Sequence, residues 1–290
     1  MAKTWLVTGS SRGLGFAIAK AALEAGDNVV ATARDPGQIA LGGVRLRKVA
    51  LDVTSFEAAR AAVAAAVEAF GRLDVVVNNA GYGNVTAFEE STDEDFRRQF
   101  ETNFFGVVNV TKAALPVLRA QRSGHVIQIS SIGGRTTSPG LSSYQSAKWA
   151  VGGFSEAVQM ETKPLGIHFT VVEPGGMRTD WAGSSMRVDE PGPDYEATVG
   201  MFTKGIRQNQ AVLRSDPERC AAAILRLAAA EKPPLRLLLG TDAMFLAKFV
   251  SERRAAEDAR WAELSASSDA EGQVPFEETD SAKFLQSMRD

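Results

Sequence analysis

The sequence predicts an α/β fold in which one doubly wound, seven-stranded parallel sheet is flanked by helices. Strand-length apolar runs alternate with helix-length amphipathic segments almost to Gly240, a rhythm typical of a parallel sheet covered by helices. A glycine-rich turn follows the first apolar run, and nothing in the 290 residues requires a second domain. The strand-length runs are residues 4–8, 28–33, 45–50, 73–78, 124–130, 168–173 and 235–239.

Five amphipathic segments supply the helices between these runs. The last of them starts with Asp216 as its cap and Pro217 at the first helical position. Residues 56–70 are rich in alanine, which is the best helix former, and Phe56 and Val63 belong to an apolar stripe, so we interpret this segment as a helix as well. The predicted helices are residues 14–25, 56–70, 93–122, 143–163 and 217–231.

Two segments depart from this rhythm. Residues 182–205 contain clustered glycine and proline and leave the sixth strand at its carboxyl end, where ligands bind in open α/β sheets. We therefore expect a substrate lid at about residues 181–215, within a main domain formed by residues 1–264. Residues 265–290 are polar and acidic, and we expect them to form a loosely ordered carboxyl-terminal tail.

Composition excludes several classes of partner. A formal net charge of -3 leaves no excess of positive charge for nucleic acid, which is therefore not an expected partner. The single cysteine, Cys220, cannot form an internal disulfide, and the first residues lack the pattern of a secretory signal. No stretch reaches about 18 consecutive apolar residues, so we expect no membrane span. Together these observations predict a cytoplasmic protein.

The turn after the first apolar run carries three glycines and reads Thr8-Gly9-Ser10-Ser11-Arg12-Gly13-Leu14-Gly15. Glycine lets the backbone turn sharply and approach a pyrophosphate at the amino end of a helix. The spacing differs from the G-x-G-x-x-G of the general dinucleotide fingerprint. Taken alone, the cluster also fits a plain strand-to-helix turn.

The pattern Thr-Gly-x-x-x-Gly-x-Gly after an amino-terminal strand resembles the signature of the short-chain dehydrogenase/reductase family. The resemblance covers roughly the first 240 residues. It implies a Rossmann fold, so that residues 1–264 are a catalytic domain, and an oxidoreductase that moves a hydride between a nicotinamide cofactor and a carbonyl or secondary alcohol. The further matches, in chain order, are Asn78-Asn79-Ala80-Gly81, Asn103, Ser131, Tyr144, Lys148, Pro174-Gly175 and Thr179.

The same resemblance implies the cofactor-binding residues. Asp52 and Val53 resemble the pair that contacts the adenine, although Asp52 also suits the cap of the next helix. Residues 79–81 would run along the cofactor, or else form only the tight turn after a buried strand. Residues 174–179 resemble the stretch that contacts the nicotinamide carboxamide. The expected set is Gly9, Ser11, Arg12, Gly13, Leu14, Gly15, Arg34, Asp52, Val53, Asn79, Ala80, Gly81, Tyr144, Lys148, Pro174, Gly175 and Thr179.

The end of the second strand selects between NAD and NADP in this family. An acidic side chain there bonds the ribose 2′-hydroxyl of NAD, whereas arginine favours a 2′-phosphate. Here Ala33 stands where NAD-preferring members carry the acid, Arg34 follows it, and Arg12 lies in the glycine turn. Two guanidinium groups on one phosphate make strong, charge-assisted contacts, which favours NADP. Asp35 keeps NAD open as an alternative, and Arg34 alone could be a solvated charge paired with it.

Tyr144 is the expected acid/base group. Its ordinary pKa near 10 makes it a poor base at neutral pH, and lowering the pKa by about 3 units requires roughly 4 kcal/mol. Lys148 lies four residues later on the same helix face, and a cation about 4 Å away supplies on the order of 4 kcal/mol at an effective dielectric near 20. The resemblance also assigns Lys148 to the nicotinamide ribose hydroxyls.

Two further residues complete the expected catalytic group. Ser131 lies thirteen residues before Tyr144 and would donate a hydrogen bond to the substrate oxygen. We prefer it to Ser130, whose hydroxyl we expect to bond within the backbone turn. Asn103 resembles the family asparagine whose backbone carbonyl holds a water next to Lys148, although an asparagine within a helix is often only a surface residue.

Other functions lack the residues that they would require. His125 and His168 open strands at the end opposite the expected crevice, which argues against a metal site or a Ser-His-Asp triad. The main alternative is an NAD(P)-binding sensor or regulatory protein with little turnover. Similar proteins pair through the helix at residues 143–163, so we expect a homodimer or homotetramer. Apolar lid residues indicate an apolar small-molecule substrate, unless they pack against the domain: Trp181, Met186, Tyr195, Met201 and Phe202.

Overall fold

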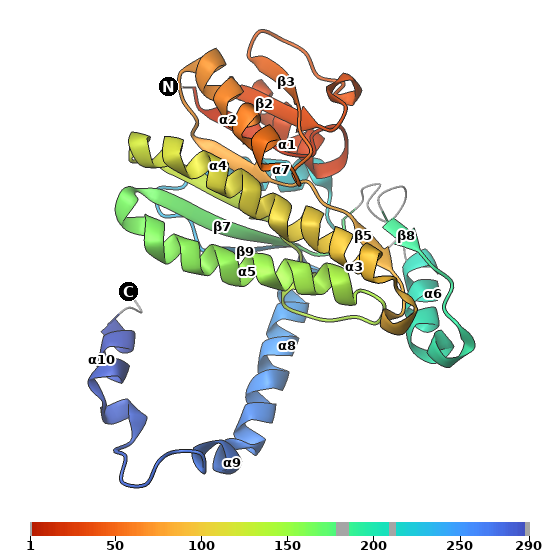
Figure 1. Cartoon of the computed structure of the whole chain (residues 1–290), viewed down its shortest axis with the longest axis vertical. Coiled ribbons are helices and arrows are strands. Elements are labelled where there is room, and N and C mark those ends of the chain that lie inside the picture. The colour runs from red at the N-terminus through yellow and green to blue at the C-terminus, as the bar shows by residue number, and fades with distance from the viewer. Residues whose placement is uncertain (1, 178–185, 209–212, 288–290) are drawn as a thin grey trace. The chain divides into compact units, whose positions relative to one another are not determined.

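The computed structural model describes residues 2–177, 186–208 and 213–287 (Figure 1). The chain divides into two compact units, Met1–Ala247 and Lys248–Asp290. Every strand in the described residues belongs to the first unit, so the sheet and its covering helices form there. The predicted boundary at residue 264 and the acidic tail beyond it stay predictions.

The main sheet has seven strands, all parallel, in the order β3-β2-β1-β4-β6-β7-β9. The order reverses between β1 and β4, which places the ligand crevice of a doubly wound sheet outside the carboxyl ends of these two strands. The predicted fold class is confirmed, and each predicted strand is present. The strands are β1 (Thr4–Val7), β2 (Asn28–Ala33), β3 (Leu46–Ala50), β4 (Val75–Asn78), β6 (Gly124–Ile129), β7 (Ile167–Pro174) and β9 (Arg236–Leu239).

Helices cover both faces of this sheet, as the amphipathic segments predict. Side chains alternate along a strand, so in β1 Val7 faces one layer and Leu6 faces the other. One layer is built on α1 and α7, where Ile18 and Ile224 are fully buried. The opposite layer contains α2, α4 and α5. Figure 1 shows α4 and α5 on this face of the sheet, next to β7. The five helices are α1 (Gly13–Glu24), α2 (Phe56–Phe70), α4 (Gly106–Gln121), α5 (Ser142–Thr162) and α7 (Pro217–Ala228).

Helix starts follow local capping chemistry. The backbone N–H of Arg219 donates to the Asp216 carboxylate (2.9 Å), so the predicted cap of α7 is confirmed. The cap of α2 is Ser55, whose hydroxyl accepts from the N–H of Ala58 (3.2 Å). Asp52 instead accepts from the N–H of Thr54 (3.0 Å), so the alternative reading of Asp52 as that cap is wrong.

The single helix predicted at residues 93–122 is interrupted. The structure has α3 (Asp93–Phe100), one wider π-helical stretch at Glu101–Phe105, and then α4. Periodicity does not reveal such a stretch, because the apolar pattern continues through it. Stretches of this kind are frequent at functional sites, and this one contains Asn103.

Short elements in the predicted lid, and a short strand that pairs with it, were not expected from the sequence. β5 (Gly83–Val85) and β8 (Met186–Val188) form a separate two-stranded parallel sheet, and α6 (Met201–Gln208) follows. Three-residue strands carry too few residues to show an alternation, and their partners are far apart in the sequence. Trp181 and Thr179 lie outside the described residues.

The second unit is helical in its described residues. α8 (Thr241–Arg260) contains the boundary between the units, and α9 (Ala262–Ala266) and α10 (Asp280–Ser287) follow it. Nearly all side chains of this unit are exposed, with Ala282 and Val250 as buried exceptions. Among the described helices of the chain, none is long and apolar enough to cross a membrane.

Candidate active site

The glycine turn brings the start of α1 close to the end of β1. Arg12 precedes α1 in an extended conformation, and a guanidinium has no acceptor atom with which to cap the first N–H groups of the helix. A Cβ atom at residue 15 would lie 2.3 Å from the carbonyl oxygen of Gly9, so only glycine allows α1 to start this close to the turn. Leu14 points into the core and anchors the helix start.

The end of β4 holds this turn in place. The N–H groups of Asn79 and Ala80 both donate to the Thr8 hydroxyl (2.9 and 3.0 Å). The Asn79 side-chain amide donates to the carbonyl oxygen of Thr8 (2.9 Å). Asn79 therefore takes part in the tight turn after β4, which was one of the two roles expected for residues 79–81. The same hydrogen bonds hold these residues beside the glycine turn.

The end of β2 lies next to the same turn. The N–H of Ser10 donates to the carbonyl oxygen of Thr32 (2.8 Å), two residues before Arg34. Arg34 and Arg12 are both exposed. The Asp35 carboxylate accepts from the N–H of Gly37 (2.9 Å) and caps a short turn, and no ion pair joins it to Arg34 within the described residues. The alternative pairing of Arg34 with Asp35 is therefore not seen.

The third strand end brings Val53 against the helix layer. Val53 is buried and its backbone oxygen accepts from the Asn109 amide (3.0 Å), whereas Asp52 is exposed. The exposed position of Asp52 next to buried Val53 is compatible with the adenine contact implied by the family pattern, which stays a prediction.

Tyr144 and Lys148 project from the first turns of α5, and both side chains are buried. The Lys148 ammonium donates to the carbonyl oxygen of Ile129 (2.9 Å) at the end of β6. It lies 5.7 Å from the centre of the Tyr144 ring. Gly81 lies beside the same ammonium, so α5 and the loop after β4 meet at this point.

Burial controls the ionisation of this pair. It raises the pKa of Tyr144 to about 12, against a hydrogen bond with Ser131 that lowers it. It also lowers the pKa of Lys148 to about 8. The expectation that Lys148 holds the pKa of Tyr144 below its ordinary value is wrong for the protein alone, because both groups have lost their contact with water and Lys148 is directed at a backbone carbonyl.

The two neighbouring serines have different partners. The Ser131 hydroxyl accepts from the N–H of Gly133 (3.0 Å) and bonds to Tyr144, so it lies next to the candidate acid/base group. The Ser130 hydroxyl donates to the backbone oxygen of Lys148 (3.3 Å), a contact with α5. The expected bond within its own turn is therefore not formed, because α5 packs directly on the end of β6.

Asn103 is fully buried, which excludes the reading of a surface residue. Its side-chain oxygen accepts from the N–H of Tyr82 (3.1 Å), and its amide donates to the carbonyl oxygen of Tyr82 (2.9 Å). Asn103 thus fixes the loop that carries Gly81 beside Lys148. Its expected role through a water on its backbone carbonyl stays a prediction.

The end of β7 is held by a residue that the sequence did not reveal. Asp242, at the start of α8, accepts from the N–H of Gly176 (2.8 Å), directly after Pro174 and Gly175. Asp242 lies far from these residues in the sequence and belongs to no motif, so no local signal could have identified it. The two predicted residues Pro174 and Gly175 do lie at the carboxyl end of the sheet.

The model of the short chain dehydrogenase family matches residues 3–189. The chain belongs to this family. It is 51% identical over 273 residues to oxidoreductase BOA17 of Botryotinia fuckeliana, covering 92% of this chain and 100% of that protein. A short-chain dehydrogenase from Streptomyces avermitilis has 39% identity and a TM-score of 0.85, over 92% and 98% of the two chains. One from Burkholderia cenocepacia, solved in complex with NADP, has 26% identity and a TM-score of 0.72, over 89% and 97%.

This short-chain dehydrogenase has an apolar wall next to Tyr144. Val85 of β5 and Met186 of β8 are buried in one cluster with Tyr144 and Leu141, and Val188 packs against them. These residues alternate with polar ones along β5 and β8, so the small sheet has an apolar face and a polar face. The wall therefore consists of paired strands and does not depend on a loop alone.

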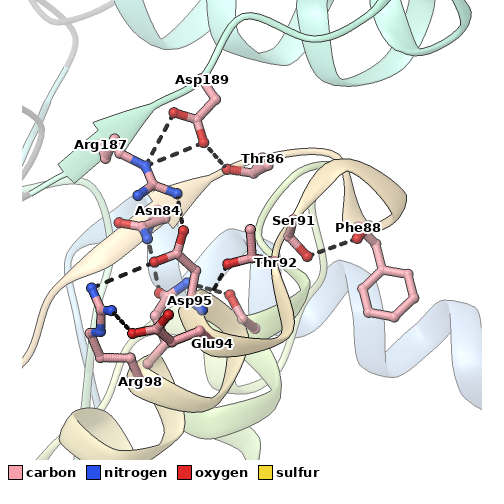
Figure 2. A network of polar contacts seen from close by, with 12 residues as sticks. Asn84, Thr86, Phe88, Ser91, Thr92, Glu94, Asp95, Arg98, Arg187 and Asp189 are labelled. Atoms are coloured by element: carbon pink, nitrogen blue, oxygen red, sulfur yellow. Dashed lines mark hydrogen bonds and ion pairs between the residues drawn. The ribbon is translucent and has the colours of Figure 1, made fainter.

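The polar face of this small sheet is tied to the helix layer (Figure 2). Arg187 of β8 donates to the Asp95 carboxylate of α3 (2.6 Å), and Figure 2 shows Asp189 bonded to both Arg187 and Thr86. On β5 the N–H of Asn84 donates to the side chain of buried Gln99 (3.2 Å), which in turn bonds to Ser143 beside Tyr144. These contacts connect the wall to the start of α5.

The two histidines of the short-chain dehydrogenase lie at the amino ends of β6 and β7. Their rings are 6.3 Å apart, and the His125 ring bonds to the Thr170 hydroxyl (2.9 Å). Burial, with a smaller effect of His168, lowers the pKa of His125 to about 3. His125 is therefore a buried packing residue. Across the described ranges no group of three or more His, Cys, Asp or Glu residues could hold a metal ion.

Proposed function

We propose that this short-chain dehydrogenase moves a hydride between NADP(H) and a carbonyl or secondary alcohol, with Tyr144 as the acid/base group. The observation that carries the proposal is the buried Tyr144, bonded to Ser131 and one helical turn from Lys148, whose ammonium lies beside Gly81 at the strand end that contacts the glycine turn. The residues expected to bind the cofactor suit a dinucleotide. The amino end of α1 would face its pyrophosphate, and Arg12 and Arg34 are both exposed nearby.

The protonation states support carbonyl reduction. With a pKa of about 12, Tyr144 carries its proton at neutral pH and is ready to donate it to a carbonyl oxygen. Ser131 would donate a hydrogen bond to the same oxygen as negative charge develops there. Lys148, with a pKa of about 8, would stabilise the phenolate and then return a proton to it. When bound, the reduced cofactor supplies the hydride.

Several features support NADP over NAD. Arg34 directly follows β2, where a 2′-phosphate would lie, Arg12 is on the neighbouring turn, and the Asp35 carboxylate is occupied as a cap. A guanidinium on a phosphate makes strong, charge-assisted hydrogen bonds. The structural relative from Burkholderia cenocepacia was solved with NADP, which agrees with this proposal.

The first test is a fluorescence titration with NADPH and NADH. We expect the wild-type protein to bind NADPH more tightly than NADH by roughly 10- to 100-fold, since each hydrogen bond to a charged group contributes about 1.5–3 kcal/mol. Arg12→Ala with Arg34→Ala should remove this preference by weakening NADPH binding, with NADH binding almost unchanged. Arg47→Ala, an exposed arginine of β3, is the control and should leave both affinities unchanged.

The other outcomes identify the competing proposals. Equal or tighter binding of NADH to the wild-type protein would exclude the NADP assignment and leave the family intact. Tight NADPH binding without reduction of any carbonyl compound would favour the sensor or regulatory reading. The expected homodimer or homotetramer and the cytoplasmic location remain separate predictions, and light scattering after gel filtration tests the first.

An apolar substituent next to the reacting carbonyl would suit the wall beside Tyr144. Met186 is only 7% exposed there, while Met201, also in the lid, is 67% exposed. Burial of apolar surface stabilises a ligand by about 25 cal/mol per Å², so a bulky apolar substituent would gain most from this wall. We therefore propose an apolar ketone or the corresponding alcohol as the substrate class.

Met186→Ala is expected to widen the site. Removing several side-chain atoms should raise kcat/KM for a bulky aryl ketone relative to acetone by about tenfold, since one methylene in an apolar pocket changes discrimination by roughly 10-fold or more. Met201→Ala is the matched control and should leave the ratio unchanged because its side chain is exposed. Equal changes in the two variants would show that Met186 does not line the substrate site.

A further inference from the structure

A fully buried carboxylate lies directly before the stretch expected to contact the nicotinamide. Glu173 is the residue of β7 before Pro174, and its side chain has no exposed surface. One carboxylate oxygen accepts from Arg135 (2.7 Å) and the other from Arg236 of β9 (2.5 Å). Arg236 also bonds to Glu156 of α5 (2.6 Å), so one charged network joins a loop, two strands and a helix.

Stability alone does not explain this network. Taking a carboxylate and a guanidinium out of water is costly, and apolar residues in place of a buried ion pair are often equally stable. Removing the only partner of a buried charge costs about 3–5 kcal/mol, and removing one of the two arginines should cost less because Glu173 keeps the other. What a buried ion pair supplies is a defined geometry between the elements that carry it. The elements that carry Arg135 and Arg236 therefore indicate which parts of the site the network holds in place.

Arg135 is tied to the catalytic serine by a short, fully hydrogen-bonded turn. The N–H of Gly134 donates to the carbonyl oxygen of Ser131 (2.8 Å). The N–H of Gly133 donates to the Ser131 hydroxyl oxygen (3.0 Å), which leaves the hydroxyl hydrogen directed to Tyr144. A turn closed in this way moves as one piece, so the position of Arg135 sets the position of the Ser131 side chain.

Arg236 uses the same carboxylate from the opposite side. Its guanidinium passes over α5 at Gly152, where a Cβ atom would lie 2.5 Å from it. This contact gives Gly152 a packing reason that is independent of any subunit contact. Arg236 is in β9 and shares no turn with Ser131. Arg236 thus neutralises Glu173 as Arg135 does, but it has no connection to Ser131.

We propose that Arg135, held by Glu173, is a positioning residue that keeps the Ser131 hydroxyl aimed at the reacting oxygen. Because Glu173 also precedes Pro174 and Gly175, the same ion pair sets the distance between the catalytic serine and the strand end that faces the cofactor. The inference rests on the proposed reductase function for its kinetic test. It adds to that function a residue outside the Ser-Tyr-Lys group.

The test is a double-mutant cycle on kcat with a carbonyl substrate that the wild-type enzyme reduces with NADPH. Ser131→Ala should lower kcat by about 100-fold or more, as expected for loss of one donor at a developing oxyanion. Arg135→Met should lower kcat by roughly 10- to 100-fold, the cost of a displacement near 1 Å. In the Ser131→Ala background, Arg135→Met should lower kcat by less than about threefold.

Arg236→Met is the matched control, because it also leaves Glu173 with one arginine. It should lower the free energy of unfolding about as much as Arg135→Met, with kcat within about threefold of wild type. Arg135→Lys keeps the charge and should restore part of the lost kcat. Equal losses of kcat in Arg135→Met and Arg236→Met, or losses that multiply with Ser131→Ala, would overturn the positioning role.

A readout without turnover separates this inference from the proposed function. Crystal structures of both variants should show the Gly133 N–Ser131 Oγ hydrogen bond retained in Arg236→Met and lost in Arg135→Met. If the wild-type protein reduces no carbonyl compound, the proposed function fails, and these two structures still decide whether Arg135 positions Ser131. If Arg135→Met does not fold, Arg135→Gln, which also removes the charge, replaces it in both measurements, and an unmoved Ser131 contradicts the inference.

Discussion

Tyr144→Phe is expected to lower kcat for NADPH-dependent carbonyl reduction by roughly 10³-fold, within the range of general acid catalysis, and to leave NADPH affinity within about twofold. The change removes only the hydroxyl that donates the proton, while the ring still fills its buried position in the wall cluster. Steady-state kinetics and a fluorescence titration on the same preparation measure the two quantities.

Tyr82→Phe is the matched control for this substitution. The structure uses the backbone of Tyr82, through its bonds with Asn103, so loss of its hydroxyl should leave kcat within about twofold of wild type. A Tyr144→Phe enzyme with nearly normal kcat would show that another group donates the proton. Loss of NADPH binding in Tyr144→Phe would instead mean that the hydroxyl is needed to hold the cofactor.

Lys148→Met is expected to change how stability depends on pH. The pKa of Lys148 falls from 10.5 to about 8 on folding, so between these values the unfolded chain binds more protons than the folded one. The cost of burying the ammonium is therefore fully present below about pH 8 and disappears as the pH rises towards 10.5. It amounts to roughly 3 kcal/mol at 1.36 kcal/mol per pKa unit.

Urea denaturation at pH 7 and at pH 10 measures this effect. The free energy of unfolding of the wild-type protein should rise relative to that of Lys148→Met by about 2–3 kcal/mol between the two pH values. Lys163→Met, at the exposed end of the same helix, should show no such rise. A constant difference between the wild-type protein and Lys148→Met would mean that the ammonium is hydrated in the folded state. The variant should also lose most of its activity, because the cation beside Tyr144 is removed.

Local pattern was sufficient to predict the sheet and to single out candidate site residues. The alternating apolar runs and amphipathic segments predicted all seven strands of the main sheet, because parallel strands buried on both faces are marked by their own composition. The glycine turn and the Tyr144–Lys148 pair are marked by short spacings within single elements, and Ser131 was expected from the family resemblance and its separation of thirteen residues from Tyr144. The structure brings these groups together at the carboxyl ends of the strands, as this topology requires.

Short strands and an interrupted helix could not be predicted from the pattern of apolar residues. β5 and β8 have three residues each and gain their stability from partners distant in the chain, such as the contact of Arg187 with Asp95. The π-helical stretch around Asn103 leaves the apolar periodicity intact and was predicted as ordinary helix. Asp242 and Glu173 acquire their contacts only when β7, β9 and α8 assemble.

The sequence by itself determined the fold class and the family resemblance, and it singled out Tyr144 as the candidate acid/base group, because each depends on residue types at short, regular separations. The tertiary structure decided the ionisation of that group and the neighbours that hold it. Burial raises the pKa of Tyr144 and lowers that of Lys148, and burial depends on side chains that meet only in the folded protein. The charged network behind Ser131 has the same origin, since its members come from four separate elements of the chain.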